Sequence, residues 1–248
     1  MKKLFLIGNQ KMNMNYSTLE AYFEALGDIA EKSDNVVGVC VPYVYINLAK
    51  YMLEGSRVLF GAENMHWEEN GAYTGEISAS MLNDFGCDLV IIGHSERRNL
   101  FHETNEEVNL KLKSALDSGI TPILCFGETL GQRESGLTYT VIEEQLASAL
   151  DGIDEEEMGR IIFAYEPVWA IGTGKSASPT QAGGICAFAK KFLKENYMLT
   201  DCIMLYGGSL KPSNAEAILS EKSINGGLIG GACLNISDFK ALIETKVE

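Results

Sequence analysis

The sequence predicts an α/β protein built as a closed (β/α)8 barrel, with eight parallel strands ringed by eight helices. Short, fully apolar segments rich in β-branched residues alternate with longer segments of helical character along the 248 residues. Strands that lack a polar face are typical of a parallel sheet covered by helices. Eight strand–helix units in about 250 residues match the size of one closed barrel. The alternative is an open doubly wound sheet, which the same alternation permits.

Each element is predicted from its own segment. The strands are the apolar runs Leu4–Gly8, Val36–Val41, Val58–Ala62, Leu89–Gly93, Thr121–Phe126, Ile161–Glu166, Cys202–Gly207 and Gly227–Gly230. The helices lie between them, over Ser17–Lys32, Val44–Leu53, Ser78–Phe85, Asn105–Ser118, Tyr139–Leu150, Pro179–Asn196, Pro212–Ser220 and Ser237–Thr245. No linker or low-complexity run divides the chain, so we expect a single barrel domain over residues 1–248.

Composition and charge limit the possible partners. The chain has 20 basic and 34 acidic residues, a formal net charge of −14. Nucleic acids and anionic membrane surfaces both require a basic face, so neither is expected as a partner. No apolar run is long enough for a signal-peptide core or a membrane span. The six cysteines form no C-x-x-C pair and most lie in apolar runs, which predicts reduced thiols in a cytoplasmic protein.

Functional residues are expected at the carboxyl ends of the strands, where the active sites of barrel enzymes lie. Asn9, Gln10 and Lys11 follow the first predicted strand. A lysine is most often plain surface charge. In the mouth of an acidic barrel, however, Lys11 is the natural local cation for an anionic substrate.

A histidine follows the fourth predicted strand, in Gly93-His94-Ser95-Glu96-Arg97-Arg98. If a short helix begins at Ser95, its N-terminus disfavours the imidazolium form of His94. The neutral ring can then donate a hydrogen bond to a carbonyl oxygen. Glu96 either orients Lys11 across the barrel mouth or belongs, with the two following arginines, to a structural ion-pair cluster.

A carboxylate, Glu166, ends the sixth predicted strand, and Pro167 stops further strand pairing. An acid at this place can simply leave the strand for solvent. The segment behind it indicates another role, because Val168 and Trp169 lead into a loop with an apolar tip at Ala170-Ile171-Gly172. Such a loop can close over a ligand and exclude water. We therefore interpret Glu166 as a catalytic base and the loop as its lid.

Glycine-rich segments follow strands seven and eight, at Tyr206-Gly207-Gly208-Ser209 and Gly226–Ala232, which includes Gly230 and Gly231. Glycines let backbone N–H groups approach an anion, and barrels frequently bind phosphate at these two loops. The pair of segments predicts a phosphate site without an arginine cluster. No metal-ligand motif is present, and Gly174-Lys175-Ser176 lacks the spacing of a P-loop, so neither a metal nor a nucleotide cofactor is expected.

Taken together, these motifs closely resemble those of the triosephosphate isomerase family, from Gly8 to near the C-terminus. The most specific is Ala164-Tyr165-Glu166-Pro167-Val168-Trp169-Ala170-Ile171-Gly172-Thr173-Gly174-Lys175. The histidine motif and both glycine segments are also similar to those of that family.

The resemblance implies a cofactor-free interconversion of dihydroxyacetone phosphate and D-glyceraldehyde 3-phosphate through an enediolate, as in glycolysis and gluconeogenesis. It makes Glu166 the base that moves the proton and neutral His94 the group that polarises the carbonyl. It makes Lys11 and Asn9 the stabilisers of the enediolate. The phosphate would be held by backbone N–H groups of Gly172, Ser209, Gly230 and Gly231.

The resemblance also implies a homodimer, formed by docking the long loop Asn64–Ile77 into a neighbouring subunit near Lys11 and His94. Without the resemblance, the composition of that loop would indicate only a mobile surface loop. The chain departs from the usual family pattern at Gln10, where the family has Trp, and at Glu63, where it has Gln. A glycine pair, Gly183-Gly184, also falls within a predicted helix.

Two other functions are compatible with the fold. A phosphate-binding lyase or aldolase would commonly place a Schiff-base lysine inside a strand, and the predicted strands contain none. A non-catalytic binding protein would be favoured if Glu166, His94 or Lys11 were missing, and all three are present. The sequence therefore favours the isomerase.

Overall fold

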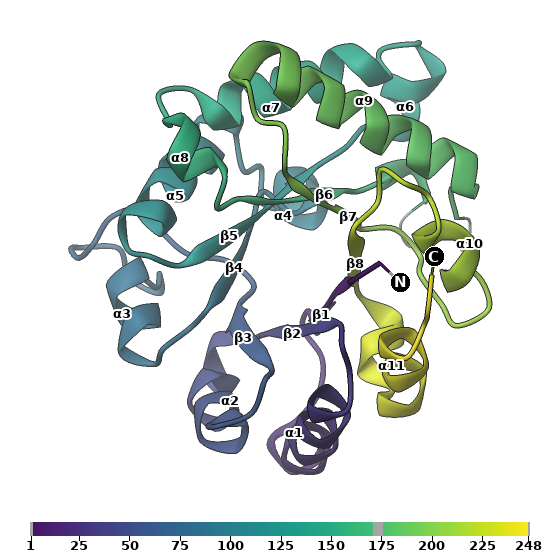
Figure 1. Ribbon diagram of the computed structural model, residues 1–248. Coiled ribbons are helices and arrows are strands. Elements are labelled where there is room, and N and C mark those ends of the chain that lie inside the picture. The colour runs from purple at the N-terminus through teal and green to yellow at the C-terminus, as the bar shows by residue number, and fades with distance from the viewer. Residues whose placement is uncertain (1, 171–175, 248) are drawn as a thin grey trace.

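Eight parallel strands form a closed barrel in the computed structural model, which describes residues 2–170 and 176–247 (Figure 1). Each strand pairs with the next one along the chain, and Phe5 of β1 pairs with Gly226 of β8 to close the ring. This closure confirms the barrel and rules out the open sheet. The strands are β1 (Phe5–Asn9), β2 (Val36–Val41), β3 (Leu59–Ala62), β4 (Leu89–Ile92), β5 (Thr121–Phe126), β6 (Ile162–Tyr165), β7 (Ile203–Tyr206) and β8 (Gly226–Ile229).

The helices surround the barrel, and every helix predicted from the sequence is present. They are α1 (Tyr16–Glu31), α2 (Ile46–Leu53), α3 (Ala79–Asp84), α4 (Ser95–Leu100), α5 (Asn105–Asp117), α6 (Leu130–Glu134), α7 (Thr138–Leu150), α8 (Glu155–Met158), α9 (Pro179–Tyr197), α10 (Ala215–Leu219) and α11 (Ile236–Ile243). Three short 3-10 helices, η1 (Tyr43–Tyr45), η2 (Val168–Ala170) and η3 (Gly231–Leu234), follow β2, β6 and β8.

The prediction of eight helices was too low by three for the described part of the chain. The additional helices α4, α6 and α8 are four to six residues long, too short to show apolar periodicity. Each begins at a side-chain cap: His94 for α4, Thr129 for α6 and Asp154 for α8. Capping satisfies backbone N–H groups that the first turn leaves free, so it stabilises such short helices.

Two apolar layers hold the barrel together. The interior is filled by inward-facing strand side chains, among them Ile7, Cys40, Leu89, Ile91, Ile123, Cys125, Ile162, Ala164, Leu205 and Leu228. The outward-facing strand residues pack against the helices in a second and larger layer. Because both faces of each strand are buried, the strands must be apolar throughout, which is why their runs are continuous in the sequence.

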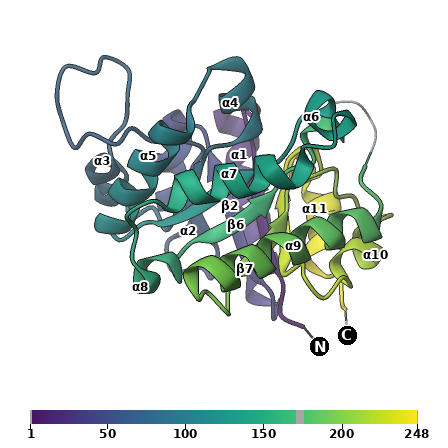
Figure 2. The ribbon, with the colours of Figure 1, turned by 90° about the horizontal axis from the view of Figure 1, so that it is seen from above.

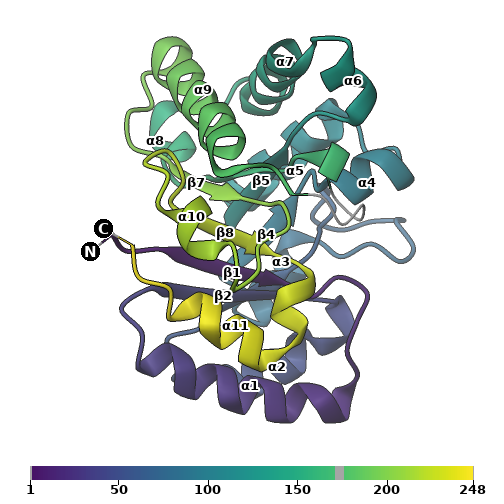
Figure 3. The same cartoon turned by 90° about the vertical axis from the view of Figure 1, so that its right-hand side faces the viewer.

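The two ends of the barrel differ. Figure 2 shows α4 and α6 at one end, where the strands finish, and both chain termini at the other. The loop between β3 and α3 projects from the ring of helices at the side of α3 and α5. In Figure 3 the termini again lie close together, and α1 and α11 run side by side.

The glycine pair in α9 has a structural explanation at one of its two positions. A Cβ atom at Gly183 would lie 2.4 Å from Oε2 of Glu221, which approaches the helix there. A Cβ atom at Gly184 would meet no atom within 4 Å, so nothing in the structure explains that glycine. None of the described helices is long and apolar enough to cross a membrane.

Candidate active site

A cavity of about 780 Å³ opens at the carboxyl ends of the strands. It is lined by the loops after β1, β4, β7 and β8, which the barrel brings together from distant parts of the sequence. Among its lining residues are six that the sequence singled out: Asn9, Lys11, His94, Ser209, Gly230 and Gly231. The charged residues among its described lining are Lys11, Lys211 and Asp238, which give this lining a net positive charge in an acidic chain.

Lys11 is held by its own loop. Its backbone has a φ of 53°, a left-handed conformation that is rare for a residue with a side chain. The Lys11 N–H donates to Oδ1 of Asn9 at 3.1 Å, and Nδ2 of Asn13 donates to the carbonyl oxygen of Gln10 at 2.8 Å. Because Oδ1 of Asn9 already accepts this hydrogen bond, the NH2 group of Asn9, at Nδ2, is the part of the side chain that can donate into the cavity.

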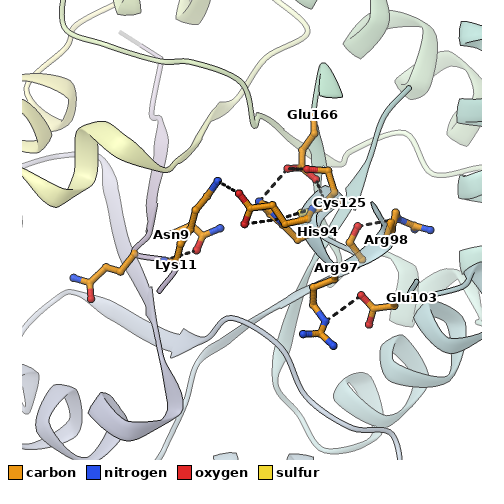
Figure 4. Close-up of polar contacts among 12 residues, drawn as sticks. Asn9, Lys11, His94, Arg97, Arg98, Glu103, Cys125 and Glu166 are labelled. Carbon is orange, nitrogen blue, oxygen red and sulfur yellow. Dashed lines mark hydrogen bonds and ion pairs between the residues drawn. The ribbon is translucent and has the colours of Figure 1, made fainter. Parts of the chain in front are cut away.

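The ammonium of Lys11 reaches across the barrel mouth to Glu96 on α4, with 2.5 Å between Nζ and Oε1 (Figure 4). The neighbouring arginines point elsewhere: Arg97 lies 3.4 Å from a carboxylate oxygen of Glu103, and Arg98 donates to the carbonyl oxygen of Gly93 at 2.8 Å. This geometry favours the interpretation of Glu96 as the partner that orients Lys11 over its assignment to an ion-pair cluster with the arginines.

His94 caps the N-terminus of α4. Its Nδ1 accepts a hydrogen bond from the backbone N–H of Glu96 at 3.2 Å, so Nδ1 carries no proton. Its Nε2 lies 3.1 Å from Oε1 of Glu166 and is therefore the protonated nitrogen (Figure 4). The ring is neutral in this arrangement, with one N–H directed toward the centre of the site.

Glu166 is almost fully buried, and both of its carboxylate oxygens have donors. Oε2 accepts from the backbone N–H of Ser95 at 2.8 Å, and Oε1 accepts from the Ser95 hydroxyl at 2.9 Å. The carboxylate thus faces Ser95 and borders a small cavity of about 70 Å³ beside the main one. The sequence reasoning missed Ser95 as a partner; its place directly after His94 at the same strand end was the only signal.

Glycine is required where β5 passes Glu166. A Cβ atom at Gly127 would lie 1.8 Å from the carbonyl oxygen of Glu166, far closer than any van der Waals contact. The Gln145 side chain clamps this glycine from the other side, accepting from its N–H at 2.9 Å and donating to its carbonyl oxygen at 3.2 Å. The backbone of Glu166 is therefore fixed by direct packing against the neighbouring loop.

A buried acid that the sequence reasoning missed, Glu128, anchors the segment behind Glu166. Its side chain is completely buried and accepts from Nε1 of Trp169 at 3.0 Å and from the hydroxyl of Tyr165 at 3.2 Å. Arg133 donates to the same carboxylate at 2.7 Å and stacks over the Trp169 ring at 4.6 Å from its centroid. The start of the predicted lid is thus fixed to α6. No local pattern in the sequence marks Glu128.

The predicted phosphate loops lie together at the edge of the cavity. Ser209 follows β7, while Gly230 and Gly231 lie where β8 passes into η3. A Cβ atom at Gly230 would lie 3.3 Å from Cε of Lys11, so this turn and the lysine side chain are neighbours. Gly172 and the rest of the predicted lid at 171–175 lie outside the described residues.

Both departures from the family pattern lie beside Lys11. Gln10 is fully buried, and neither polar atom of its side chain makes a hydrogen bond of normal geometry with the described residues. Glu63 lines a cavity of about 320 Å³ together with Lys11 and Glu96. Its Oε1 is buried and has no hydrogen-bond partner in the described part of the chain. Burial and, to a smaller extent, the Glu96 carboxylate raise the pKa of Glu63 to about 8, although Lys11 opposes the shift.

Cys125 lies beneath the site, and burial followed by the charge of Glu166 raises the pKa of its thiol well above the ordinary value. A thiol that stays protonated is a poor nucleophile, so Cys125 is a packing residue here. Among residues 2–170 and 176–247, no group of three or more His, Cys, Asp or Glu side chains is placed to hold a metal ion.

Comparisons with known proteins agree with this geometry. The family model for triosephosphate isomerase matches residues 4–246. The triosephosphate isomerase of Alkaliphilus metalliredigens is 44% identical over 246 residues, covering 98% of this chain and 99% of the relative. That of Hydrogenovibrio crunogenus is 44% identical over 252 residues, covering both chains fully. The crystal structure of triosephosphate isomerase from Bartonella henselae superposes with a TM-score of 0.87 at 36% identity, covering 97% of each chain. By motif, fold and full-length similarity, the chain belongs to the triosephosphate isomerase family.

Proposed function

We propose that this chain interconverts dihydroxyacetone phosphate and D-glyceraldehyde 3-phosphate, the isomerisation expected of its family in glycolysis and in gluconeogenesis. The observation that carries the proposal is that His94 and Lys11 line one cavity together with the two glycine loops, and that His94 also contacts Glu166 at 3.1 Å beside that cavity. Figure 4 shows these three side chains close together. Each reactant has a carbonyl next to a carbon that bears the transferred proton, and a phosphate at the other end of a three-carbon chain.

Glu166 is the proposed base. Its carboxylate is held by Ser95 and His94, next to the main cavity rather than in it. Rotation of the side chain away from Ser95 would bring the carboxylate to the substrate carbon. There it takes a proton from one carbon and returns it to the next, so that acid and base roles are filled by one residue.

His94 and Lys11, with Asn9, are the proposed stabilisers of the enediolate. The N–H at Nε2 of His94 donates to the carbonyl oxygen on which negative charge develops, and the Lys11 ammonium lies on the same side of the cavity. Donors fixed in place before the reaction need no reorganisation when the charge appears. Glu96 acts as a positioning residue, since it holds the Lys11 ammonium at the barrel mouth.

The phosphate is proposed to bind at Ser209, Gly230 and Gly231, with Gly172 of the lid completing the site. Support comes from the place of the first three at the cavity edge and from the nearby positive charge of Lys11 and Lys211. Closure of the lid would exclude water from the enediolate and so suppress loss of its phosphate.

A dehydrogenase-coupled assay with D-glyceraldehyde 3-phosphate tests the proposal. Glu166→Gln should lower kcat by about 10²–10⁴, the usual contribution of a positioned base, while inorganic phosphate still binds. Glu156→Gln makes the same chemical change at an exposed acid on α8 and should leave kcat unchanged. Near-native turnover of Glu166→Gln would remove Glu166 as the base. Phosphate binding without any turnover by the unmodified chain would indicate a binding protein instead.

We further propose that the chain acts as a homodimer in the cytoplasm, through the loop Asn64–Ile77. The base of this loop is fixed by Lys111, which donates to Oδ1 of Asn64 at 2.9 Å and pairs with Glu103. Large apolar side chains stay exposed around it, including Met12, Tyr73 and Phe101. Exposed apolar patches of this kind mark protein–protein contacts. All six cysteines are free thiols, which supports a reducing compartment.

Sedimentation tests the dimer. A species of twice the chain mass should persist into the nanomolar range, and Tyr73→Asp should shift the chain toward monomers with reduced turnover. A monomer that is fully active at nanomolar concentration would contradict the proposal.

A further inference from the structure

A groove lies between α1 and α11 and extends to the end of the barrel where the chain termini lie. These two helices are far apart in the sequence but lie side by side (Figure 3). The groove encloses a cavity of about 1100 Å³, which extends to the segment before β1, the turn after α1 and the residues after α11. Its volume is that of a site for a drug-sized ligand, and it is larger than the active-site cavity.

The lining of the groove is positively charged, whereas the chain as a whole is negatively charged. Among the described residues, five lysines and three carboxylates line it, which gives this part of the lining a net charge of +2 while the whole chain carries −14. The lysines are Lys2, Lys3, Lys32, Lys240 and Lys246, and the acids are Asp28, Asp34 and Glu244. An anion is repelled by most of this protein's surface, so a local excess of cations is where it can bind.

Three of the five ammonium groups are available to a ligand. Lys2 is already used, because its Nζ donates to backbone carbonyls of Leu219, Glu221 and Ile224. Lys240 lies 3.8 Å from Glu244 in an exposed pair that contributes little. The ammonium groups of Lys3, Lys32 and Lys246 make no hydrogen bond or ion pair with the described residues, and all three side chains are exposed.

The floor of the groove is aliphatic. Ala25 and Ile29 from α1 and Ile236 from α11 line it and are half-buried, while Ile243 lies fully buried beneath them. Ile29 and Ile236 also pack on the core. None of the described residues that line the cavity is aromatic, so they offer no stacking surface for a nucleotide base or another ring. Ser33, Ser237 and Thr245 add hydroxyl groups close to the lysines.

We propose that the groove between α1 and α11 is a second ligand site, one that binds a small amphipathic anion with a phosphate or carboxylate head and an aliphatic body. The head contacts Lys3, Lys32 and Lys246 at the rim, and the body covers the exposed parts of Ile29 and Ile236. This site is separate from the isomerase reaction and does not depend on its mechanism.

Methyl NMR of the full chain with octyl phosphate tests the proposal, because different methyl groups report on the two cavities. Ile29 and Ile236 report on the groove, while Leu228 and Leu234 line the active site. Saturable shifts at Ile29 and Ile236 are expected. Shifts confined to Leu228 and Leu234 would overturn the proposal, since they would place the only site at the barrel mouth.

The variants K32E/K246E and K194E/K222E separate the groove from general charge effects. Both change the net charge of the chain equally, but Lys194 and Lys222 are exposed and line neither cavity. The first pair should weaken octyl phosphate binding in the groove roughly tenfold, and the second less than twofold. Equal effects of the two pairs would overturn the proposal, and isomerase turnover should stay unchanged in both.

Further probes define the ligand. Octanoate that shifts the same methyl groups would show that any anionic head suffices, whereas binding of octyl phosphate alone would select phosphate. Inorganic phosphate should not shift Ile29 or Ile236. If it binds the groove as tightly as octyl phosphate, the aliphatic floor has no role and the proposal is wrong.

Discussion

Two acids flank the barrel mouth, Glu166 after β6 and Glu63 after β3, and their surroundings are opposite. Glu166 is met by three donors, two from Ser95 and one from His94. Glu63 has a buried oxygen without any partner in the described chain, and the pKa of its carboxyl is raised to about 8. A buried carboxylate is stabilised only where donors are built around it. The contrast indicates that the fold supplies hydrogen-bond donors for a carboxylate at Glu166. At Glu63 it leaves one carboxyl oxygen without a donor, which favours the neutral acid.

The largest effect is expected from removing the Lys11 ammonium, the cation beside Glu63 at the barrel mouth. Lys11→Met should lower kcat/KM by about 10²–10³, the typical effect of losing one donor at developing charge. Lys50→Met changes an exposed lysine on α2 and serves as the control in the coupled assay. A loss below about threefold for Lys11→Met would show that the loop after β1 does not take part in the chemistry.

The second change displaces Glu166 while its side chain stays intact. Gly127→Ala would place a methyl group 1.8 Å from the Glu166 carbonyl oxygen, so the backbone of the base must move. A misplacement of this kind should lower kcat by about 10². Overpacking should also lower the Tm by roughly 3–10 °C.

Gly131 supplies the control for this experiment, because a Cβ atom there would meet nothing within 4 Å. Gly131→Ala in α6 should keep wild-type kcat and Tm. If both variants behave alike in the assay and in thermal unfolding, contact with the β5 loop is not what fixes Glu166.

The third and smallest effect concerns Glu63. Its pKa is about 8 in the folded chain against 4.5 when unfolded, so the folded state binds more protons between these values. Stability therefore falls as pH rises from about 4.5 to 8, and the penalty is complete above pH 8. Glu63→Gln should raise the Tm at pH 8.5 by roughly 4–10 °C.

The pH dependence isolates this effect from other consequences of the substitution. Below pH 4.5 the acid is neutral in both states, so the gain in Tm should vanish there. Turnover at pH 7 should stay within about twofold of wild type, since the folded acid is already neutral. A gain in Tm that is independent of pH would mean that the substitution acts through packing.

The sequence was sufficient for the barrel because the relevant information is local. Continuous apolar runs defined β2 and β5 with their observed limits, and the other strands within one or two residues. The strand ends also located Lys11, His94 and Glu166, because parallel strands deliver their carboxyl ends to one place. The short helices α4, α6 and α8 depend on single caps and left no periodic signal.

What the sequence could not supply is the set of contacts between distant loops. Glu128 is fixed to Trp169 across 41 positions, and Glu166 to Ser95 across 71. Neither pair shares a motif, so only the closed ring brings them together. The unpaired oxygen of Glu63, Oε1, was hidden for the same reason, since a missing partner is visible only when every neighbouring element is in place.

The chain ends have a practical consequence. The N–H of Lys2 donates to the carbonyl oxygen of Val247 at 3.2 Å, at the end of the barrel away from the catalytic loops. Termini that meet in this way permit circular permutation. A short linker could join them and new ends could be opened in an exposed turn, such as the one at Gly152. The linker would then connect the segment after α11 to β1 covalently, across a seam where β1 and β8 now meet only through hydrogen bonds and apolar packing.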